Sequence, residues 1–189
     1  MTIRSILKTA CLFLNKQNLC EKIDLPDLTD VDEADKNEIA FLLKCLNLVY
    51  QEIATDYIPL LHKENIQVVD NKILFTDLEK KFFEVVSIKD ENGCKVKFKT
   101  YPNYIEVNKN EVDIVYKYTP ASLDALISTM ENFSNKVSEI TFAFGIVMEY
   151  SFINGLHEDA LIWEKRFKDA LFIRSGKKSC IKLPVRRWC

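Results

Sequence analysis

Glycine is scarce in this chain, with four residues among 189. Gly93, Gly145, Gly155 and Gly176 lie far apart, so no glycine-rich loop can bring the backbone close to a phosphate group. This spacing excludes the Walker and dinucleotide-binding fingerprints. The sequence also lacks the GxSxG motif of α/β-hydrolases.

Histidine is rarer still, and cysteines are not arranged in pairs. His62 and His157 have no cysteine or carboxylate at the usual sequence spacing of a metal site. None of the six cysteines forms a CxxC or CxH pair, and Cys11 and Cys45 are predicted to be buried on apolar helix faces. We therefore expect no catalytic site, no cofactor and no bound metal, and free thiols in a reducing cytoplasm.

Long apolar runs are missing too. No stretch reaches the ~18 residues that a membrane-spanning helix needs. The N-terminal segment has one arginine, a short apolar run and no cleavage site, which predicts an amphipathic helix and not a signal peptide. We expect no membrane partner.

Hydrophobic residues are plentiful, at 48% of the chain with 11% aromatics, which predicts a packed core. The apolar periodicity is helical over about residues 3–16, with Thr2 as the cap, and over about residues 36–57, with Asp35 and Glu38 at capping-box spacing. It is helical again over about residues 137–153, ending at Asn154-Gly155, and over about residues 158–173.

Between residues 60 and 120 the apolar period changes to two, which indicates strands. Asp70-Asn71 and Asn92-Gly93 each separate two short apolar runs and predict hairpins. After the second turn, Cys94, Val96 and Phe98 alternate with lysines, which predicts one buried and one solvated face.

The predicted fold class is α+β. Two N-terminal helices (1–59) and two C-terminal helices (121–173) form a four-helix core, and residues 60–120 form an antiparallel β insertion between helices 2 and 3. Residues 174–189 form an extended basic tail.

Charge is unevenly spread although the net charge is −2. Eight acids lie between residues 21 and 38, and six bases with no acid lie between residues 174 and 189. The acidic segment is either a solvated loop or a docking loop with Asp27, Asp30, Asp32 and Glu33. It lacks the central glycine and final glutamate of a calcium-binding EF-hand.

The C-terminal tail combines residue types that dominate interface hot spots. Its predicted docking residues are Leu183, Pro184, Arg186, Arg187 and Trp188. The alternative is that Trp188 folds back onto its own helices.

Several segments resemble the head–tail connector (adaptor) proteins of tailed bacteriophages and prophages. They are "DVDEADKNEIAFLLKCLNLVYQEIATDYIPL", "VDIVYKYTP", "FGIVMEYSFINGLHEDALIWEKRFKDAL" and the closing "LPVRRW". The match spans most of the chain in order, but its positions are mainly apolar and aromatic.

The resemblance implies a subunit of a ring, typically of twelve copies, that docks beneath the portal protein and extends the DNA channel toward the tail. The partners would be other copies of the chain, the portal protein and a downstream tail or head-completion protein. Double-stranded DNA would pass through without sequence-specific binding. The location would be the head–tail interface of the virion, after assembly in the host bacterial cytoplasm.

Two other functions stay open. One is a different phage assembly or tail-completion protein. The other is nucleic-acid binding, since the predicted strands combine aromatic side chains with bases. These residues are Tyr101, Tyr104, Tyr116 and Tyr118 with Lys95, Lys97 and Lys99.

Overall fold

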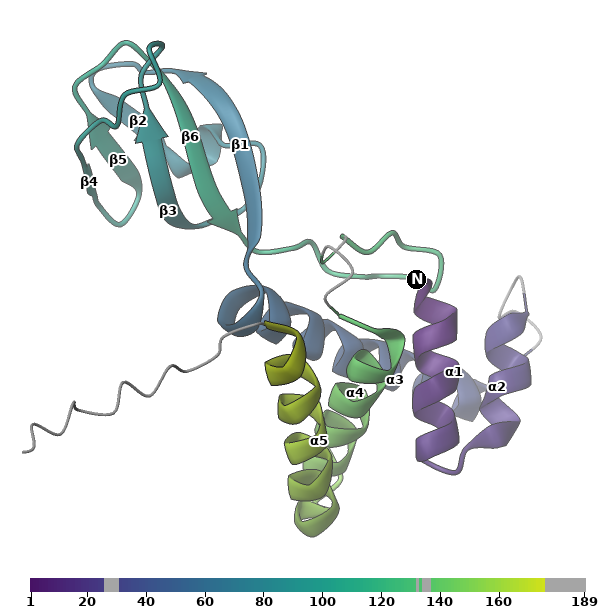
Figure 1. Cartoon of the computed structure of the whole chain (residues 1–189). Helices are drawn as coiled ribbons and strands as arrows, with labels where there is room; N and C mark the ends of the chain where they lie inside the picture. Colours follow the sequence, from purple (N-terminus) through teal and green to yellow (C-terminus); the bar gives the residue numbers. More distant parts are fainter. Residues whose placement is uncertain (26–30, 132, 134–136, 176–189) are drawn as a thin grey trace, which may run out of the picture.

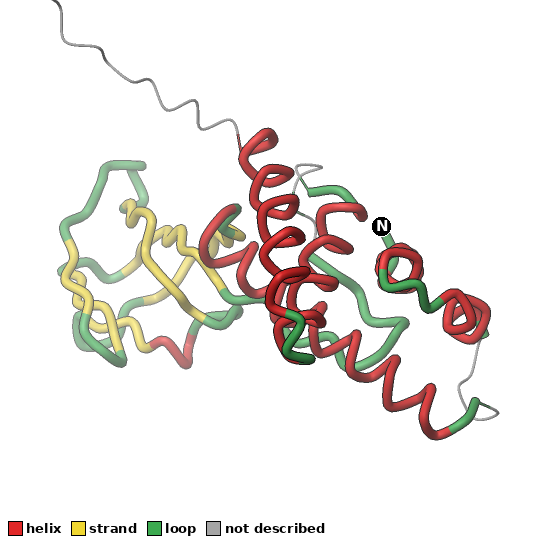
Figure 2. The backbone as a smooth tube through the Cα atoms, turned by 90° about the horizontal axis from the view of Figure 1, so that it is seen from below, coloured by secondary structure: helices red, strands yellow, loops and turns green. Residues whose placement is uncertain are grey.

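The structure, a computed structural model, describes residues 1–25, 31–131, 133 and 137–175. It divides into a helical body, made of helices α1 to α5, and a β lobe, residues Leu60–Tyr118, that projects from one end of the body (Figure 1). Seen along a perpendicular direction, helices and strands again occupy separate regions (Figure 2). The α+β class is confirmed. The described residues contain five α-helices, however, where four were expected.

The N-terminal helix is shorter than predicted. Helix α1 spans Ile3–Phe13, and the Thr2 hydroxyl caps it by accepting the Ser5 N–H at 3.3 Å. Asn15, with a φ of 58°, then turns the chain into a second helix, α2, at Gln17–Asp24. Leu19 and Ile23 of α2 are buried. Part of the segment predicted to be an acidic loop is therefore helical.

Helix α3 spans Glu33–Glu52 and continues into a π-helical turn, Ile53–Tyr57. Most of its predicted apolar face is buried, but Leu43 and Tyr57 are half-buried. The predicted capping box is wrong, because the helix begins earlier, with Asp32 at its N-cap position. Asp35 and Glu38 instead pair with lysines of the α1–α2 region.

Helix α4, Glu139–Ile153, lies at the centre of the body and packs against α1, α3 and α5. Ser138 caps its start, and Gly155, with a φ of 75°, follows its end as predicted. Helix α5 spans His157–Ser175 and packs against α4 as a helical hairpin. Arg174 therefore belongs to α5 and not to the tail.

The β lobe contains two three-stranded antiparallel sheets. The first has the order β1-β6-β3, with β1 at Leu60–Gln67, β6 at Glu111–Tyr118 and β3 at Phe82–Lys89. The second has the order β2-β5-β4, with β2 at Lys72–Leu74, β5 at Tyr104–Val107 and β4 at Phe98–Thr100. A 3₁₀ turn, Phe75–Asp77, follows β2.

The predicted turns are present, but the strand pairing around them differs. Asp70 and Asn71 both have a positive φ, as a type I′ turn requires, and Gly93 has a φ of 76°. Only single bridges, Val69 to Lys72 and Lys89 to Lys95, close these turns. Strands β1 and β3 pair with β6 instead.

The prediction of a buried face after the Asn92-Gly93 turn is also wrong. Cys94 and Phe98 are exposed, and Val96 is half-buried. The reason is that β4 is a short edge strand of the second sheet, bonded on one side to β5. The lobe's buried side chains come mainly from other strands, with Ile73, Ile88, Ile105, Val107, Val112, Ile114 and Tyr116 among them.

The lobe joins the body through two chain segments that meet at the Leu60–Tyr118 strand pair. The returning segment is fixed to α3 by Asn47, whose side chain donates to the Leu123 carbonyl at 2.9 Å and accepts its N–H at 2.7 Å. The Tyr50 hydroxyl accepts the Glu131 N–H at 2.6 Å. The connection between lobe and body is therefore held by hydrogen bonds as well as by apolar packing.

Candidate docking surfaces

The predicted tail residues, Leu183, Pro184, Arg186, Arg187 and Trp188, lie outside the described residues, as do Asp27 and Asp30 of the acidic segment. Asp32 and Glu33 are described. They stand at the start of α3, where both are exposed. Neither forms an ion pair with another described residue, so both carboxylates are available to a partner.

Asp24, Asp35 and Glu38 of the same segment have structural partners. Lys8 bonds Asp24 at 2.6 Å, which ties α1 to the end of α2. Lys22 pairs with Asp35, and Lys16 pairs with Glu38, so both pairs tie the α1–α2 region to α3. Three of the eight acids between residues 21 and 38 are therefore neutralised by lysines of the chain.

Lys16 is the centre of a small polar network. Its ammonium donates to Glu38 and, at 2.7 Å, to the Tyr150 hydroxyl, which itself donates to Glu38 at 2.9 Å. Burial alone would lower the pKa of Lys16, but the hydrogen bonds to Glu38 and Tyr150 outweigh it and raise that pKa. The network connects the α1–α2 turn, α3 and α4.

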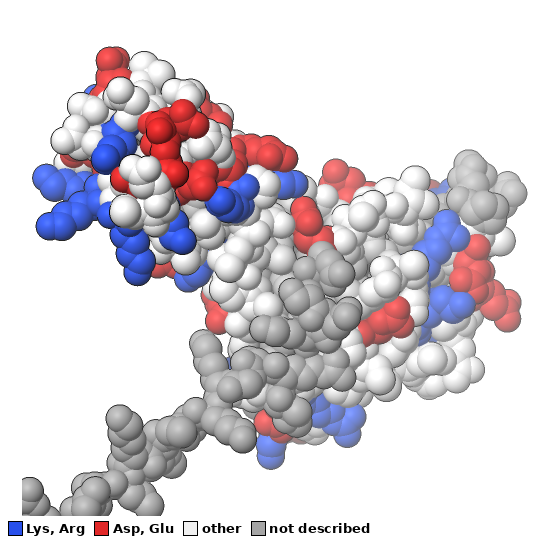
Figure 3. All heavy atoms as spheres, turned by 45° about the horizontal axis from the view of Figure 1, so that its top comes forward, with Lys and Arg blue, Asp and Glu red and all other residues white. Residues whose placement is uncertain are grey.

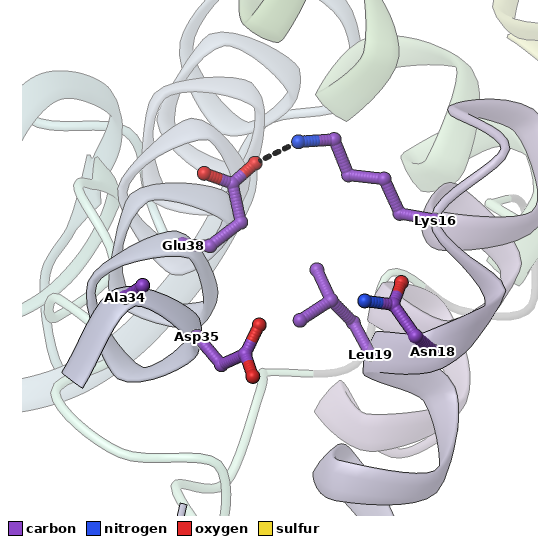
Figure 4. Close-up of a pocket in the computed structure, with 6 residues that line it drawn as sticks. All are labelled: Lys16, Asn18, Leu19, Ala34, Asp35 and Glu38. Carbon is purple, nitrogen blue, oxygen red and sulfur yellow. Dashed lines mark hydrogen bonds and ion pairs between the residues drawn. The ribbon is translucent and has the colours of Figure 1, made fainter. Parts of the chain in front are cut away.

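Beside this network lies a cavity of about 260 Å³ between the α1–α2 turn and the first turns of α3. Figure 4 shows Asp35 and Leu19 pointing into the space between the two segments, with Glu38 and Lys16 joined across it. Its lining is formed by Lys16, Asn18, Leu19, Ala34, Asp35 and Glu38. A small cavity with this mixed lining suits a polar side chain of a partner protein.

Several large apolar side chains of α5 are exposed on the helical body. Leu161, Ile162 and Phe172 are 59%, 56% and 62% exposed. A shallow groove of about 370 Å³ runs along this helix and is called here the α5 groove. It is lined by Leu161, Glu164, Lys165, Lys168, Asp169 and Phe172. Glu164 and Lys168 form an ion pair one turn apart on the helix. The apolar side chains stand at the two ends of the groove, and the charged ones lie between them.

A second apolar surface lies at the beginning of α1. Ile127 is 81% exposed there and Met1 is 54% exposed. A cavity of about 440 Å³ lies between residues 1–4 and residues 126–130. This region is called the Met1–Ile127 surface. The sequence predicted neither apolar surface, because periodicity reports which side chains face the core but not which exposed ones cluster.

The β lobe presents a different, charged surface. Lysine side chains gather along one edge of the lobe, next to a face rich in acids (Figure 3). Lys95, Lys97 and Lys99 are exposed as expected. Tyr101 and Tyr104 stack with ring centroids 4.7 Å apart, and Lys72 lies 5.1 Å from the Tyr104 ring centroid.

Two of the thiols have low reactivity. Cys11 and Cys45 are buried, as predicted, and burial raises the pKa of each to about 12. Reaction as a thiolate is therefore suppressed at neutral pH.

The environment of His62 differs from the prediction. It lies within β1, and the carboxylates of Glu64 and Glu79 lie close to it, although no carboxylate was expected at metal-site spacing. Glu64 is two residues further along the same strand, so the alternation of side chains in a strand was the signal that could have found it. His157 is the first residue of α5 and is exposed.

The chain matches no protein-family model, and no curated protein matches it. Within the described residues, no helix is long and apolar enough to cross a membrane. The resemblance to phage connectors therefore rests on the quoted sequence segments.

Proposed function

We propose that this protein is a non-enzymatic structural subunit of a phage head-to-tail connector (adaptor) ring that docks beneath the portal and extends the DNA channel toward the tail. The observation that supports it most is the exposed apolar character of α5. Leu161, Ile162 and Phe172 are each more than half exposed on this one helix. Such exposure is typical of a surface that a partner covers.

A closed ring needs two different surfaces on each subunit, because each copy contacts its neighbours head to tail. In this proposal the α5 groove of one copy meets the Met1–Ile127 surface of the next. The four-helix core of the resemblance would correspond to α1, α3, α4 and α5, which form the ring body, while the β lobe faces a neighbour or the tail side. The C-terminal tail reaches toward the portal.

The partners in this proposal are other copies of the chain, in a ring typically of twelve, the portal protein and a downstream tail or head-completion protein. Double-stranded DNA passes through the channel without sequence-specific binding. The ring belongs to the head–tail interface of the virion and assembles in the host bacterial cytoplasm. Asp32 and Glu33 supply charge that guides the register of docking more than its strength.

The decisive experiment measures particle mass, with negative-stain imaging, for the protein alone and mixed with the portal protein. We expect rings in at least one of the two conditions. The double variant Leu161→Lys/Phe172→Lys should lose them, because two charges would enter an apolar contact. A matched control is Val69→Lys, which changes a side chain 70% exposed at a turn of the β lobe.

Helical circular dichroism of both variants should equal that of the unmodified protein. A chain that stays monomeric with and without portal would contradict the proposal. Rings that persist in the double variant would show that α5 is not the contact. Removal of residues 176–189 keeps α5 complete. It should abolish binding to the portal protein and leave the contacts between copies of the chain unchanged.

The Tyr101–Tyr104 stack beside Lys72 favours a second candidate function, binding of single-stranded nucleic acid. Fluorescence anisotropy of a labelled oligonucleotide at physiological salt would separate the two. Tight binding that is lost in Tyr104→Ala would favour this second function. Binding that disappears as salt rises and is indifferent to Tyr104 would leave the connector proposal in place.

A further inference from the structure

Three potential metal ligands meet on one face of the β lobe. His62 and Glu64 lie two residues apart in β1, so their side chains leave the strand on the same side. Glu79 comes from the segment just before β3. The ligand atoms of these three residues all lie within 4.8 Å of one another, and this is the one such group found in the described part of the chain.

The imidazole of His62 is held in place by aromatic side chains of the neighbouring strand β6. Its ring stands edge-on to Tyr116 and Tyr118, with centroids 5.8 and 6.2 Å away. Nε2 lies 3.1 Å from Oε2 of Glu79, so the ring presents a nitrogen toward the carboxylates. A ligand whose ring is already fixed loses little entropy when it binds a metal.

Groups around the three ligand atoms also position this cluster. Both Glu64 oxygens lie 3.4 Å from the backbone N–H of Glu79. The Tyr116 hydroxyl accepts the Lys80 N–H at 3.1 Å. Such outer contacts commonly orient metal ligands.

No fixed cation balances the two carboxylates. Among the described residues, neither Glu64 nor Glu79 forms an ion pair with a lysine or arginine. The neighbouring Lys80 pairs with Glu131 at 3.5 Å, and Lys63 pairs with Asp113 at 2.7 Å. The carboxylates of Glu64 and Glu79 therefore meet at one place beside the His62 nitrogen, where a divalent cation would balance their charge.

We propose that His62, Glu64 and Glu79 bind a divalent transition-metal ion such as Zn²⁺, Mn²⁺ or Co²⁺. One imidazole nitrogen and two carboxylate oxygens suit these ions, whereas Mg²⁺ and Ca²⁺ prefer oxygen ligands alone. The Glu79 side chain is 65% exposed, so the ion can enter from solvent and keep water in its other positions. The bound ion joins β1 to the segment that leads into β3, across the central strand β6.

The chain contains two histidines, which makes a selective test possible. The full chain is labelled with ¹³C-histidine and titrated with ZnCl₂, MnCl₂ or MgCl₂, and both imidazole signals are followed by NMR. We expect the His62 signal to shift with Zn²⁺ and to broaden with Mn²⁺, while His157 stays unchanged and Mg²⁺ has little effect. Metal bound at the exposed Cys94 thiol would move neither signal.

The carboxylates are tested with Glu79→Gln and Glu64→Gln, each of which should weaken Zn²⁺ binding at least roughly tenfold. Glu91→Gln, an exposed change at the Asn92-Gly93 turn, should leave the affinity unchanged. Zn²⁺ should also raise the thermal midpoint of the unmodified chain but not of Glu79→Gln. An unmoved His62 signal in excess Zn²⁺, or an equal response of His157, would overturn the site whether or not the protein forms rings.

Discussion

The helical body and the β lobe are held together by different kinds of contact. In the body, α4 is surrounded by three other helices, and its buried side chains include Phe142, Ala143, Ile146 and Val147. In the lobe, Phe83, Val86 and Phe98 are substantially exposed. Ion pairs such as Lys117–Glu84 lie on its surface. The body therefore depends on close packing, whereas the lobe depends more on strand pairing and on surface polar contacts.

The largest expected difference comes from the same substitution made in each region. Phe142 is fully buried, and its ring lies 6.0 Å from that of Phe133 and 6.4 Å from that of Tyr50. Phe142→Ala should lower the free energy of unfolding by about 3–5 kcal/mol in urea titrations. Phe98→Ala, at an edge strand of the lobe, should cost less than about 1 kcal/mol. Equal losses would refute the contrast.

A glycine tests how closely the helices of the body approach. A Cβ added at Gly145 of α4 would lie 2.6 Å from a methyl carbon of Val49 on α3 and 3.1 Å from the Phe167 ring on α5. An exposed helical glycine usually gains stability on change to alanine, but Gly145→Ala should lose about 1–3 kcal/mol. The measurement is thermal or urea unfolding.

Gly93 supplies the matched control in the lobe. A Cβ there would meet nothing within 4 Å, and the only strain comes from its φ of 76°. Gly93→Ala should therefore cost only about 1 kcal/mol. A stabilised Gly145→Ala variant would mean that α3 and α5 can move apart freely, contrary to close packing of the body.

Loss of an ion pair should also cost more stability in the body than in the lobe. Both costs should be smaller than those of the core substitutions. Glu38 receives hydrogen bonds from both Lys16 and Tyr150, so Glu38→Gln should cost about 1–2 kcal/mol. Glu84 pairs only with Lys117 on the lobe surface, and Glu84→Gln should cost about 0–1 kcal/mol. Added salt should weaken the Glu84 contribution more than that of Glu38.

The smallest expected effect is a gain of stability. Burial raises the pKa of Glu149 on α4 above its usual value of 4.5, so the folded chain binds this proton more readily than the unfolded chain. The ionised carboxylate thus destabilises the fold at neutral pH, and stability increases as pH falls through the raised pKa. Glu149→Gln should raise the melting temperature by about 1–3 °C at pH 7.

This gain should disappear near pH 4, where the Glu149 carboxyl is protonated in both states. The exposed Glu91→Gln serves as the control and should change the melting temperature at neither pH. A gain that is independent of pH would indicate that the amide forms a new contact, and that the charge is not responsible.

Local patterns predicted the helices better than the sheets. The stripes of α3, α4 and α5 were readable, because each helix buries residues that recur at helical spacing. Helix α2 was missed because its acids and nearby turn residues concealed the short Leu19–Ile23 repeat. The two turns of the lobe followed from Asp70-Asn71 and Asn92-Gly93, but strand partners are chosen by burial among segments distant in sequence, which a local pattern does not encode.

The same limit applied to the candidate sites. Sequence spacing predicted no metal ligand beside His62, but Glu79, which follows the 3₁₀ turn after β2, lies close to it in the structure. Leu161 and Phe172 read as ordinary helix residues, and only the packing of α5 on α4 leaves them on the outside.

The strand pair between Leu60 and Tyr118 has a consequence for how the chain reaches its native state. Helices α3 and α4 pack together although residues 53–138 separate them. If the lobe folds first, its two ends are already adjacent, so the flexible loop to be closed shrinks to roughly a third of that length. The entropy cost of bringing α4 onto α3 then falls by about 1 kcal/mol, and we expect a lobe that folds slowly to delay the whole chain.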